Sequence, residues 1–406
     1  MYFYILVAFA ITGSTAHAAE ECRFNGIKSF YERVEQFNPI NKEISSQKKL
    51  LGANLDIAQM RPNPEFEFEF LRGQQGGEDV NSIGFQAQHI VELGSKRQNR
   101  INKTYRQKDL AELQLDIRGL KVKLDAVSMF KRVGQLDIIT SSIKEAISVF
   151  NQIIKKLNSR ARLTPEERVS LSTLELASNE YSAQLIELEN EKEIAIGQLS
   201  FYSGCKITSA SYKEIKLKTY RQSSQDTKLK GLSKLEDFKK SLAESELDIE
   251  KSLAYSNLSI GPRVEYQDQL GQDSLSVGVA LNFKLPLFNT NNGGKKKALQ
   301  KIMAQKISSQ NMKNNLVIKR KALVNKYNKL MSALKKMPGL KEIDEKHEKV
   351  EKLFSRGLVS IPMTIESHRQ QVDFLKSKFE LENDAIQTYI NINLIDGDHS
   401  SLKSIL

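Results

Sequence analysis

Between Glu65 and Phe70 the chain alternates strictly between glutamate and phenylalanine, within the stretch RPNPEFEFEFLRGQQGG. A strand points successive side chains to opposite faces, so this segment predicts a strand with one aromatic face and one anionic face. Two interpretations fit such a strand. It lies at the rim of a soluble core, where the acidic face meets water, or it forms a wall with lipid on one side and water on the other.

The hydrophobic pattern occurs twice along the chain. Ser82-Ile83-Gly84 matches Ser276-Val277-Gly278 at an offset of 194, and LNSRARLT (157–164) matches LFSRGLVS (353–360) at an offset of 196. Internal repeats of this kind indicate one structural plan used twice. The plan reads helix, strand, short loop, strand, very long helix, turn, helix.

Each half contains a predicted hairpin, at residues 64–92 and 262–288. In the second, apolar residues occupy every other position from Leu275 to Leu287. Each strand has roughly the 9–11 residues that a tilted membrane strand needs. On the membrane interpretation, the residues that face lipid are Phe66, Phe68, Phe70, Phe85, Val277, Val279, Leu281 and Phe283.

Helical hairpins follow the strands, at residues 95–200 and 295–394. Leu113, Ile117, Leu120, Leu124 and Val127 are spaced alternately by four and three residues, which is a heptad seam. Gly134 is the one weak point expected in the first long helix, whereas Met337-Pro338-Gly339 predicts a break in the second.

Both turns at the ends of these hairpins carry helix-start signals. Thr164 is expected to cap the next helix through a capping box with Glu167. In the second half Gly357 permits the chain to reverse, and Ser360 is expected to cap the helix that follows.

The expected divisions of the chain follow from this plan. Residues 1–19 are a predicted signal peptide, with an apolar run and the A-x-A sequence Ala16-His17-Ala18. Residues 20–203 form the first repeat, 204–232 a connecting segment, 233–394 the second repeat and 395–406 a tail. The fold class is mainly α with a small membrane β-barrel portion. Four strands cannot close a barrel, so three copies are expected to supply twelve.

Charge and composition narrow the functional classes. The formal net charge is +12 over 406 residues, but the lysines are spread among glutamates and no nucleic-acid-binding motif occurs. We therefore expect no nucleic-acid partner. Cys22 and Cys205 leave two alternatives open, a disulfide and two free thiols.

No arrangement of residues indicates catalysis. The mature histidines, His89, His347, His368 and His399, are scattered along the sequence without metal-ligand spacing, so each is expected to be a surface residue. No phosphate-binding glycine loop is present either. We expect no catalytic residue, cofactor or bound metal, and no enzyme activity.

The duplicated plan, the strand starts NPEFEFEF and GPRVEY, and FSRGLVSIPMTIES resemble the TolC-like outer-membrane efflux proteins. Within that family, QHIVELGSKRQNRI (Gln88–Ile101) and SRARLTPEERVSLSTLELA look most like CzcC-type channels of cobalt–zinc–cadmium efflux. The resemblance implies a homotrimeric conduit in the outer membrane of a Gram-negative bacterium, with a large periplasmic part. Its implied partners are outer-membrane lipid, a periplasmic adaptor (membrane fusion) protein and an inner-membrane pump of the RND type.

The resemblance also implies where the adaptor docks and where the channel narrows. Glu366 falls where the family places an acidic residue of the periplasmic aperture, but Met363 stands where another is expected. The alternatives to metal efflux are a drug or small-molecule channel, a type I protein-secretion channel, an exported coiled-coil scaffold or adaptor, and a secreted hydrolase. The implied docking residues are those of the two helical tips: Arg160, Ala161, Arg162, Leu163, Thr164, Arg356, Gly357, Leu358, Val359 and Ser360.

Overall fold

A computed structural model describes residues 21–22, 24, 26–75, 77–207, 231–269 and 272–397. The predicted signal peptide, residues 208–230 of the connecting segment and residues 398–406 of the tail lie outside these ranges. In chain order the elements are β1 (Glu21–Cys22), α1 (Ile27–Phe37), α2 (Pro39–Gln59), β2 (Glu65–Gln75), β3 (Glu78–Val91), α3 (Lys96–Asn158), α4 (Pro165–Ser203), β4 (Lys206–Ile207), α5 (Ser233–Ser252), β5 (Leu258–Gln269), β6 (Gln272–Phe283), α6 (Asn292–Lys336), α7 (Leu340–Ser355) and α8 (Ile361–Asp396).

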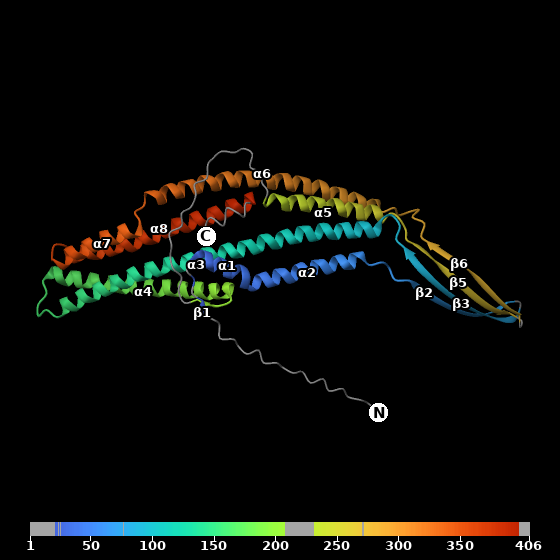
Figure 1. The fold of residues 1–406 in the computed structure, drawn as a ribbon, viewed down its shortest axis with the longest axis horizontal. Coiled ribbons are helices and arrows are strands. Elements are labelled where there is room, and N and C mark those ends of the chain that lie inside the picture. The colour runs from blue at the N-terminus through green and yellow to red at the C-terminus, as the bar shows by residue number, and fades with distance from the viewer. Residues whose placement is uncertain are drawn as a thin grey trace, which may run out of the picture.

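The molecule is a long rod with a different structure at each end (Figure 1). One end is a sheet of four strands, and the rest is a bundle of helices that run along the rod. The α3–α4 and α7–α8 turns lie together at the opposite end, and we call them the first and second tips. At 63 residues, α3 alone is about 95 Å long. The architecture confirms the predicted fold class of long helices with a small antiparallel sheet.

The two halves repeat the same order of elements. Helix α2 precedes the β2–β3 hairpin and α3, as α5 precedes the β5–β6 hairpin and α6. A backbone detail marks the repeat as well. Ser95 and Asn291 are the two non-glycine residues with positive φ (58° and 56°) in the described chain, and each directly precedes a long helix. They lie 196 residues apart, which is the offset found between the tip sequences.

The four strands are antiparallel throughout, in the order β2-β3-β5-β6, and β3–β5 pairing joins the two hairpins. The second hairpin spans Leu258–Phe283, so its predicted range of 262–288 is too late at both ends. Beyond Phe283, Pro286 has no N–H to donate to a ladder, which leaves Leu285 and Leu287 outside the strand. At Gly261 a side chain would collide with the Ala87 carbonyl, so only glycine permits this approach of β5 to β3.

The first long helix is continuous, and the second is broken. Helix α3 passes through Gly134, which is buried, without interruption. The chain leaves α6 at Met337 in an extended conformation, as expected before proline, and α7 begins at Leu340. The buried Lys378 of α8 donates from Nζ to the Pro338 carbonyl at 2.7 Å. This bond ties the predicted break to the neighbouring helix.

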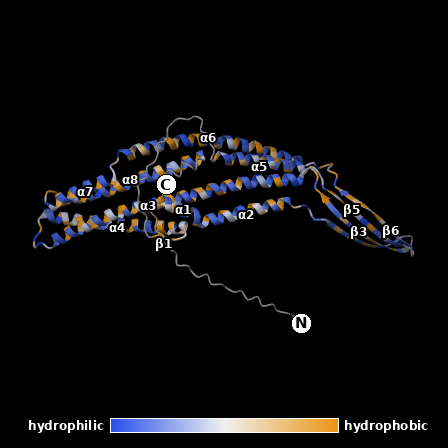
Figure 2. Ribbon diagram, viewed as in Figure 1, coloured by the Kyte–Doolittle hydropathy of each residue, from blue (hydrophilic) through white to orange (hydrophobic). Residues whose placement is uncertain are grey.

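The apolar core extends along the length of the rod. Figure 2 shows hydrophobic residues distributed along the whole length of the helical bundle. Near the tips, α3, α4, α7 and α8 pack around Phe150 and Phe379. Midway, Tyr327 and Tyr389 join α6 to α8, and beside them Phe30 stacks on Phe130 with ring centroids 4.6 Å apart.

The two cysteines form a disulfide, which the sequence left open. Cys22 and Cys205 are bonded with their Cα atoms 5.9 Å apart. Beside the bond, β1 pairs in parallel with β4, and Cys22 is opposite Ile207. The disulfide therefore fastens residues 21–22 to the chain that follows α4. None of the helices in the described part of the chain is both long and apolar enough to cross a membrane.

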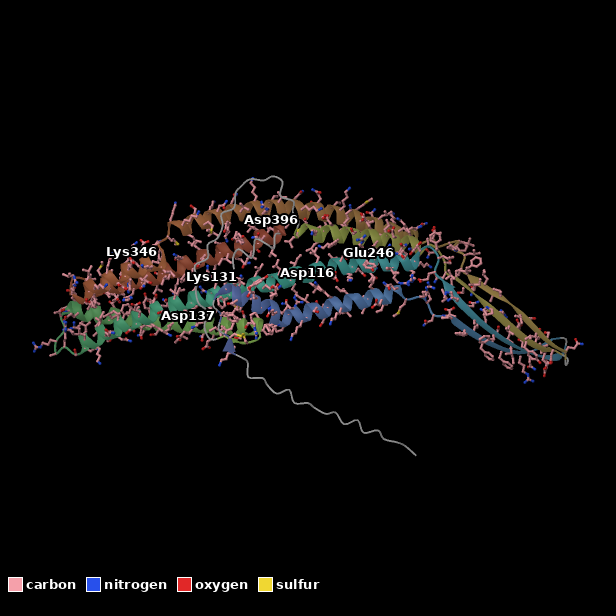
Figure 3. All side chains as sticks on the ribbon, viewed as in Figure 1. Asp116, Lys131, Asp137, Glu246, Lys346 and Asp396 are labelled. Atoms are coloured by element: carbon pink, nitrogen blue, oxygen red, sulfur yellow. A yellow bond between two sulfur atoms is a disulfide. The ribbon has the colours of Figure 1, made fainter. Side chains whose placement is uncertain are left out.

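One buried ion pair joins the two halves near the middle of the rod, where Figure 3 labels Lys131. Lys131 of α3 and Glu382 of α8 are paired, with side chains 1% and 7% exposed. Gln135 donates to the second Glu382 oxygen at 2.9 Å, and its own side-chain oxygen accepts from Asn383 at 2.9 Å. A buried charge of this kind depends on its partner for stability.

Replacing Lys131 with methionine is expected to destabilise the protein by about 3–5 kcal/mol, because Glu382 is left as an uncompensated buried charge. The double variant Lys131→Met, Glu382→Leu removes both charges and is expected to recover most of that loss. The measurement is the urea dependence of helical circular dichroism in detergent. A double variant as unstable as Lys131→Met would contradict the ion-pair explanation.

Candidate functional site

The strand register brings the alternating residues of all four strands onto common faces. Phe68 is opposite Phe85, which is opposite Val264, which in turn is opposite Val277. Residues directly opposite in an antiparallel sheet lie on the same face. The apolar alternation of β2 therefore continues across β3, β5 and β6 as one apolar band, which ends at the polar row Arg72, Asn81, Asp268 and Asp273.

This face is open to the surroundings of the single chain. Phe68 is 70% exposed and Val279 is 75% exposed. Large apolar surfaces of this size are rare on water-soluble monomers and mark contacts with lipid or protein. All eight residues that the sequence assigns to the lipid side are exposed on it: Phe66, Phe68, Phe70, Phe85, Val277, Val279, Leu281 and Phe283.

The opposite face of the sheet is polar and charged. Glu69 pairs in register with Gly84, which pairs with Glu265, while Glu67 is on the same row as Gln86 and Arg263. Arg263 lies 3.2 Å from Glu265 and 3.9 Å from Glu69. The side chains of these pairs are 40–49% exposed, and exposed ion pairs of this kind contribute little to stability.

Both outer strands of the sheet have an unpaired edge. Within the described residues, β2 pairs only with β3 and β6 pairs only with β5. Strand edges expose backbone N–H and C=O groups that need partners, and lipid offers none. The described part of the single chain therefore leaves an apolar face and two strand edges without partners.

The first tip turns through the predicted capping box. The Glu167 N–H donates to Thr164 Oγ1 at 3.2 Å, and the Thr164 N–H donates back to the Glu167 carboxylate at 2.9 Å. This backbone bond, followed by the charge of the nearby ion-paired Arg160, lowers the pKa of Glu167. Ala161 and Arg162 are exposed, whereas Leu163 packs on the apolar core near the tips.

The second tip turns at Gly357, whose φ is +73°. The Gly357 N–H bonds to the Phe354 carbonyl at 2.8 Å and the Leu358 N–H to the Leu353 carbonyl at 3.0 Å, which together form a Schellman motif. The expected side-chain cap by Ser360 is wrong, because its hydroxyl makes no capping bond. Pro362 occupies the second helical position and has no N–H to offer that hydroxyl.

The second tip presents apolar side chains to solvent. Leu358 is 70% exposed and Met363 is 62% exposed, while Val359 is half-buried. Arg356 is exposed beside them. Glu366, the candidate aperture acid, accepts from Arg369 at 2.7 and 2.8 Å, and this contact, followed by one from Gln370, lowers its pKa. Glu366 is therefore a charge already paired within its own helix.

Apolar residues are also exposed along the outer helices. Val169, Leu176, Ile186 and Ile194 on α4 are each more than 60% exposed. On α6, Ile307 and Ile318 are similarly open, at 64% and 70%. Helices of this kind bury such a stripe against another helix. The exposed stripes lie on the helices as well as on the sheet.

Two of the histidines that the sequence places apart are neighbours. His347 of α7 and His368 of α8 are 6% and 0% exposed, with ring centroids 4.4 Å apart, so the expectation of surface positions is wrong for both. Glu351 lies beside them, and the three can hold a metal ion. The sequence contains one signal for this cluster, the i, i+4 spacing of His347 and Glu351 on α7. The third member, His368, is on α8, so that spacing alone does not point to it.

The surroundings of this cluster are apolar on one side and acidic on the other. Burial, followed by the nearby His347, lowers the pKa of His368 to about 4, so its ring is neutral near pH 7. Burial, followed by the negative charge of Glu351, raises the pKa of Glu145 on α3. Phe150 presents its ring edge-on to His368 at 5.4 Å.

Comparison with known proteins gives a consistent likeness of fold. No protein-family model matches the sequence, and no curated protein matches it. Several solved outer-membrane proteins match the structure. The CmeC outer membrane channel of Campylobacter jejuni has a TM-score of 0.68 at 11% identity, over 91% of this chain and 85% of that chain.

Two further structures agree with this result. The MtrE outer membrane channel of Neisseria gonorrhoeae has a TM-score of 0.67 at 10% identity, over 91% of this chain and 88% of that one. The outer membrane protein VceC of Vibrio cholerae has a TM-score of 0.64 at 12% identity, over 91% and 96%. The likeness extends over the sheet and the helices together, and at these identities it is a likeness of fold.

Proposed function

We propose that this chain is the subunit of an outer-membrane channel, a passive conduit in a tripartite efflux system. The observation that carries the proposal is the four-stranded sheet with a broad apolar band on one face, a charged opposite face and two open edges. Lipid meets the apolar face, and water fills the space behind Glu67 and Glu69. A soluble scaffold or adaptor has no use for such a sheet.

Three copies of the chain complete the sheet as a twelve-stranded barrel. The open edges of β2 and β6 then pair between neighbours, so no backbone group faces lipid unpaired. The exposed apolar residues of α4 and α6 support the same assembly, because a ring of helices buries them between copies. The outer-membrane channels that share the fold support the location in the outer membrane.

The two tips are the docking surface for a periplasmic adaptor, which in turn joins an inner-membrane pump of the RND type. Exposed Leu358 and Met363 beside Arg356 combine apolar surface with positive charge. Arg162 adds an exposed charge at the first tip. Threefold repetition produces a ring of such patches at the end of the rod, which suits a protein partner.

The cargo is proposed from the sequence alone. The stretches that look like CzcC-type channels favour heavy-metal cations, with drugs, other small molecules or secreted proteins as the alternative. The channel itself performs no bond chemistry, and the pump supplies the energy and the selectivity. The ELGSKR segment (92–97) has a structural use here, because Glu92 accepts from Arg100 and Arg97 donates to the Gln59 carbonyl where the strand meets α3.

The membrane assignment predicts that the two faces of one strand respond differently to arginine. Phe68→Arg places a charge in lipid and is expected to cost about 2–4 kcal/mol near the bilayer midplane. Its matched control is Glu67→Arg, one residue earlier on the opposite face, which is expected to assemble normally and to alter conductance. The measurement is the yield of detergent-resistant trimers in outer-membrane fractions. Equal yields from the two variants would refute the membrane assignment.

The docking assignment predicts a loss of export without a loss of assembly. Leu358→Asp puts a charge into the exposed apolar patch of the second tip and is expected to abolish export and adaptor cross-linking. Ser377→Asp introduces the same charge at an exposed site within α8 and serves as the control. Trimer yield is measured for both variants. Normal adaptor cross-linking by Leu358→Asp would show that the tip is only a turn.

The cargo assignment predicts that deletion of the gene lowers the minimal inhibitory concentration of zinc, cobalt or cadmium. Complementation by the wild-type gene restores tolerance, and complementation by the Phe68→Arg variant does not. Tolerance to dyes and detergents is measured in the same strains. Unchanged metal tolerance with new sensitivity to dyes would reassign the channel to drug efflux.

A further inference from the structure

The buried cluster of two histidines and a glutamate between α7 and α8 has the composition of a metal site. His347 Nε2 lies 3.6 Å from Glu351 Oε1, and His368 Nε2 lies 3.9 Å from the same oxygen. One ligand atom from each residue lies within 4.8 Å of the others. His347 and Glu351 occupy one face of α7 at i and i+4, and His368 faces them from α8.

Three of the four ring nitrogens in this cluster have no partner in the described structure. His347 Nε2 and both ring nitrogens of His368 are buried without a hydrogen-bond partner. Tyr181 and Gln371, of the same region, each add one more such atom, so these four side chains account for five of the seven found in the described chain. Buried polar atoms without partners are costly and are rarely retained without a reason.

No hydrogen bond explains the arrangement. Separations of 3.6 and 3.9 Å exceed those of a hydrogen bond. A tetrahedral zinc ion with bonds of about 2.0–2.1 Å holds its ligand atoms about 3.3–3.5 Å apart. Small rotations of the three side chains therefore reach the geometry of a zinc site.

The chemistry of the donors indicates which ions fit. Imidazole nitrogen with one carboxylate suits zinc and its transition-metal neighbours, whereas calcium and magnesium prefer oxygen alone. Three protein ligands leave one tetrahedral position for water. Ser367 Oγ lies 3.5 Å from His347 Nδ1, where an outer partner of a metal-bound histidine is usually found.

We propose that His347, Glu351 and His368 bind one divalent transition-metal ion of the zinc class, which fastens α7 to α8 behind the second tip. Helix α7 is cut off from α6 by the break at Pro338 and needs attachments of its own. Lys378 holds its beginning through the Pro338 carbonyl, and the Gly357 turn holds its end. The metal holds its middle. The site is part of the subunit and does not depend on what the channel exports.

Direct zinc binding tests this proposal. The full-length protein, purified in detergent without a histidine tag and stripped with a chelator, is titrated with zinc chloride against a chromophoric chelator. One zinc ion per chain is expected. His368→Gln and His347→Gln are each expected to weaken binding by more than about 100-fold, since loss of even an outer partner of a ligand costs about 10–100-fold. His89→Gln, which removes an exposed histidine of β3, is expected to leave zinc binding unchanged.

The buried histidine variants lose zinc binding if they misfold, so the test includes a second variant and a second measurement. The Glu351 side chain is 32% exposed, so Glu351→Gln is expected to fold and still to bind zinc at least about tenfold more weakly. Zinc is expected to slow amide hydrogen exchange in residues 340–355 of the wild type, but not of Glu351→Gln. Equal zinc affinity in wild type, Glu351→Gln and His368→Gln would overturn the site, whatever the outcome of the export experiments.

Discussion

The four-stranded sheet has one apolar face and one charged face, and this separation is the constraint on which the rest of the structure depends. Once Phe68 and Val279 face one way and Glu67 and Arg263 the other, the sheet cannot be turned into a compact core. Its edges also cannot stay open in an apolar setting, because every backbone group there needs a partner. A closed assembly of several chains satisfies both demands. In the proposed assembly, the helices that continue the strands follow the same ring.

The chain leaves the sheet and enters each long helix through a junction of similar backbone conformation. Ser95 and Asn291 take the left-handed conformation immediately before α3 and α6, at equivalent places in the two halves. Gly94 also has positive φ, and a side chain there would collide with the Tyr255 ring. Each junction therefore turns the chain through a left-handed residue, after which the long helix begins. The same junction therefore occurs once in each half of the chain.

Periodic features of the chain were predictable, and single contacts between distant segments were not. Strand alternation, the heptad seam, the capping box at Thr164 and the break at Pro338 all depend on neighbours in sequence, and the structure contains each of them. The hairpin limits at Leu258 and Phe283 depend on cross-strand pairing and were misplaced. The meeting of His347 with His368 depends on how α7 packs against α8, so the sequence alone could not distinguish a buried pair from two surface residues.

The two tips are alike in sequence but differ in mechanics. The first tip lies at the end of α3, which runs without interruption from the sheet. That one helix therefore fixes the position of the first tip. The second ends α7, a helix of 16 residues that is separated from α6, and helices in proteins draw most of their stability from packing against their neighbours. Its position must come from contacts with α8 and the apolar core near the tips. This difference explains why buried polar groups gather there, with Lys378 bonded to the Pro338 carbonyl and His347 against His368. These contacts attach α7 to the rod at the end that carries the proposed docking surface.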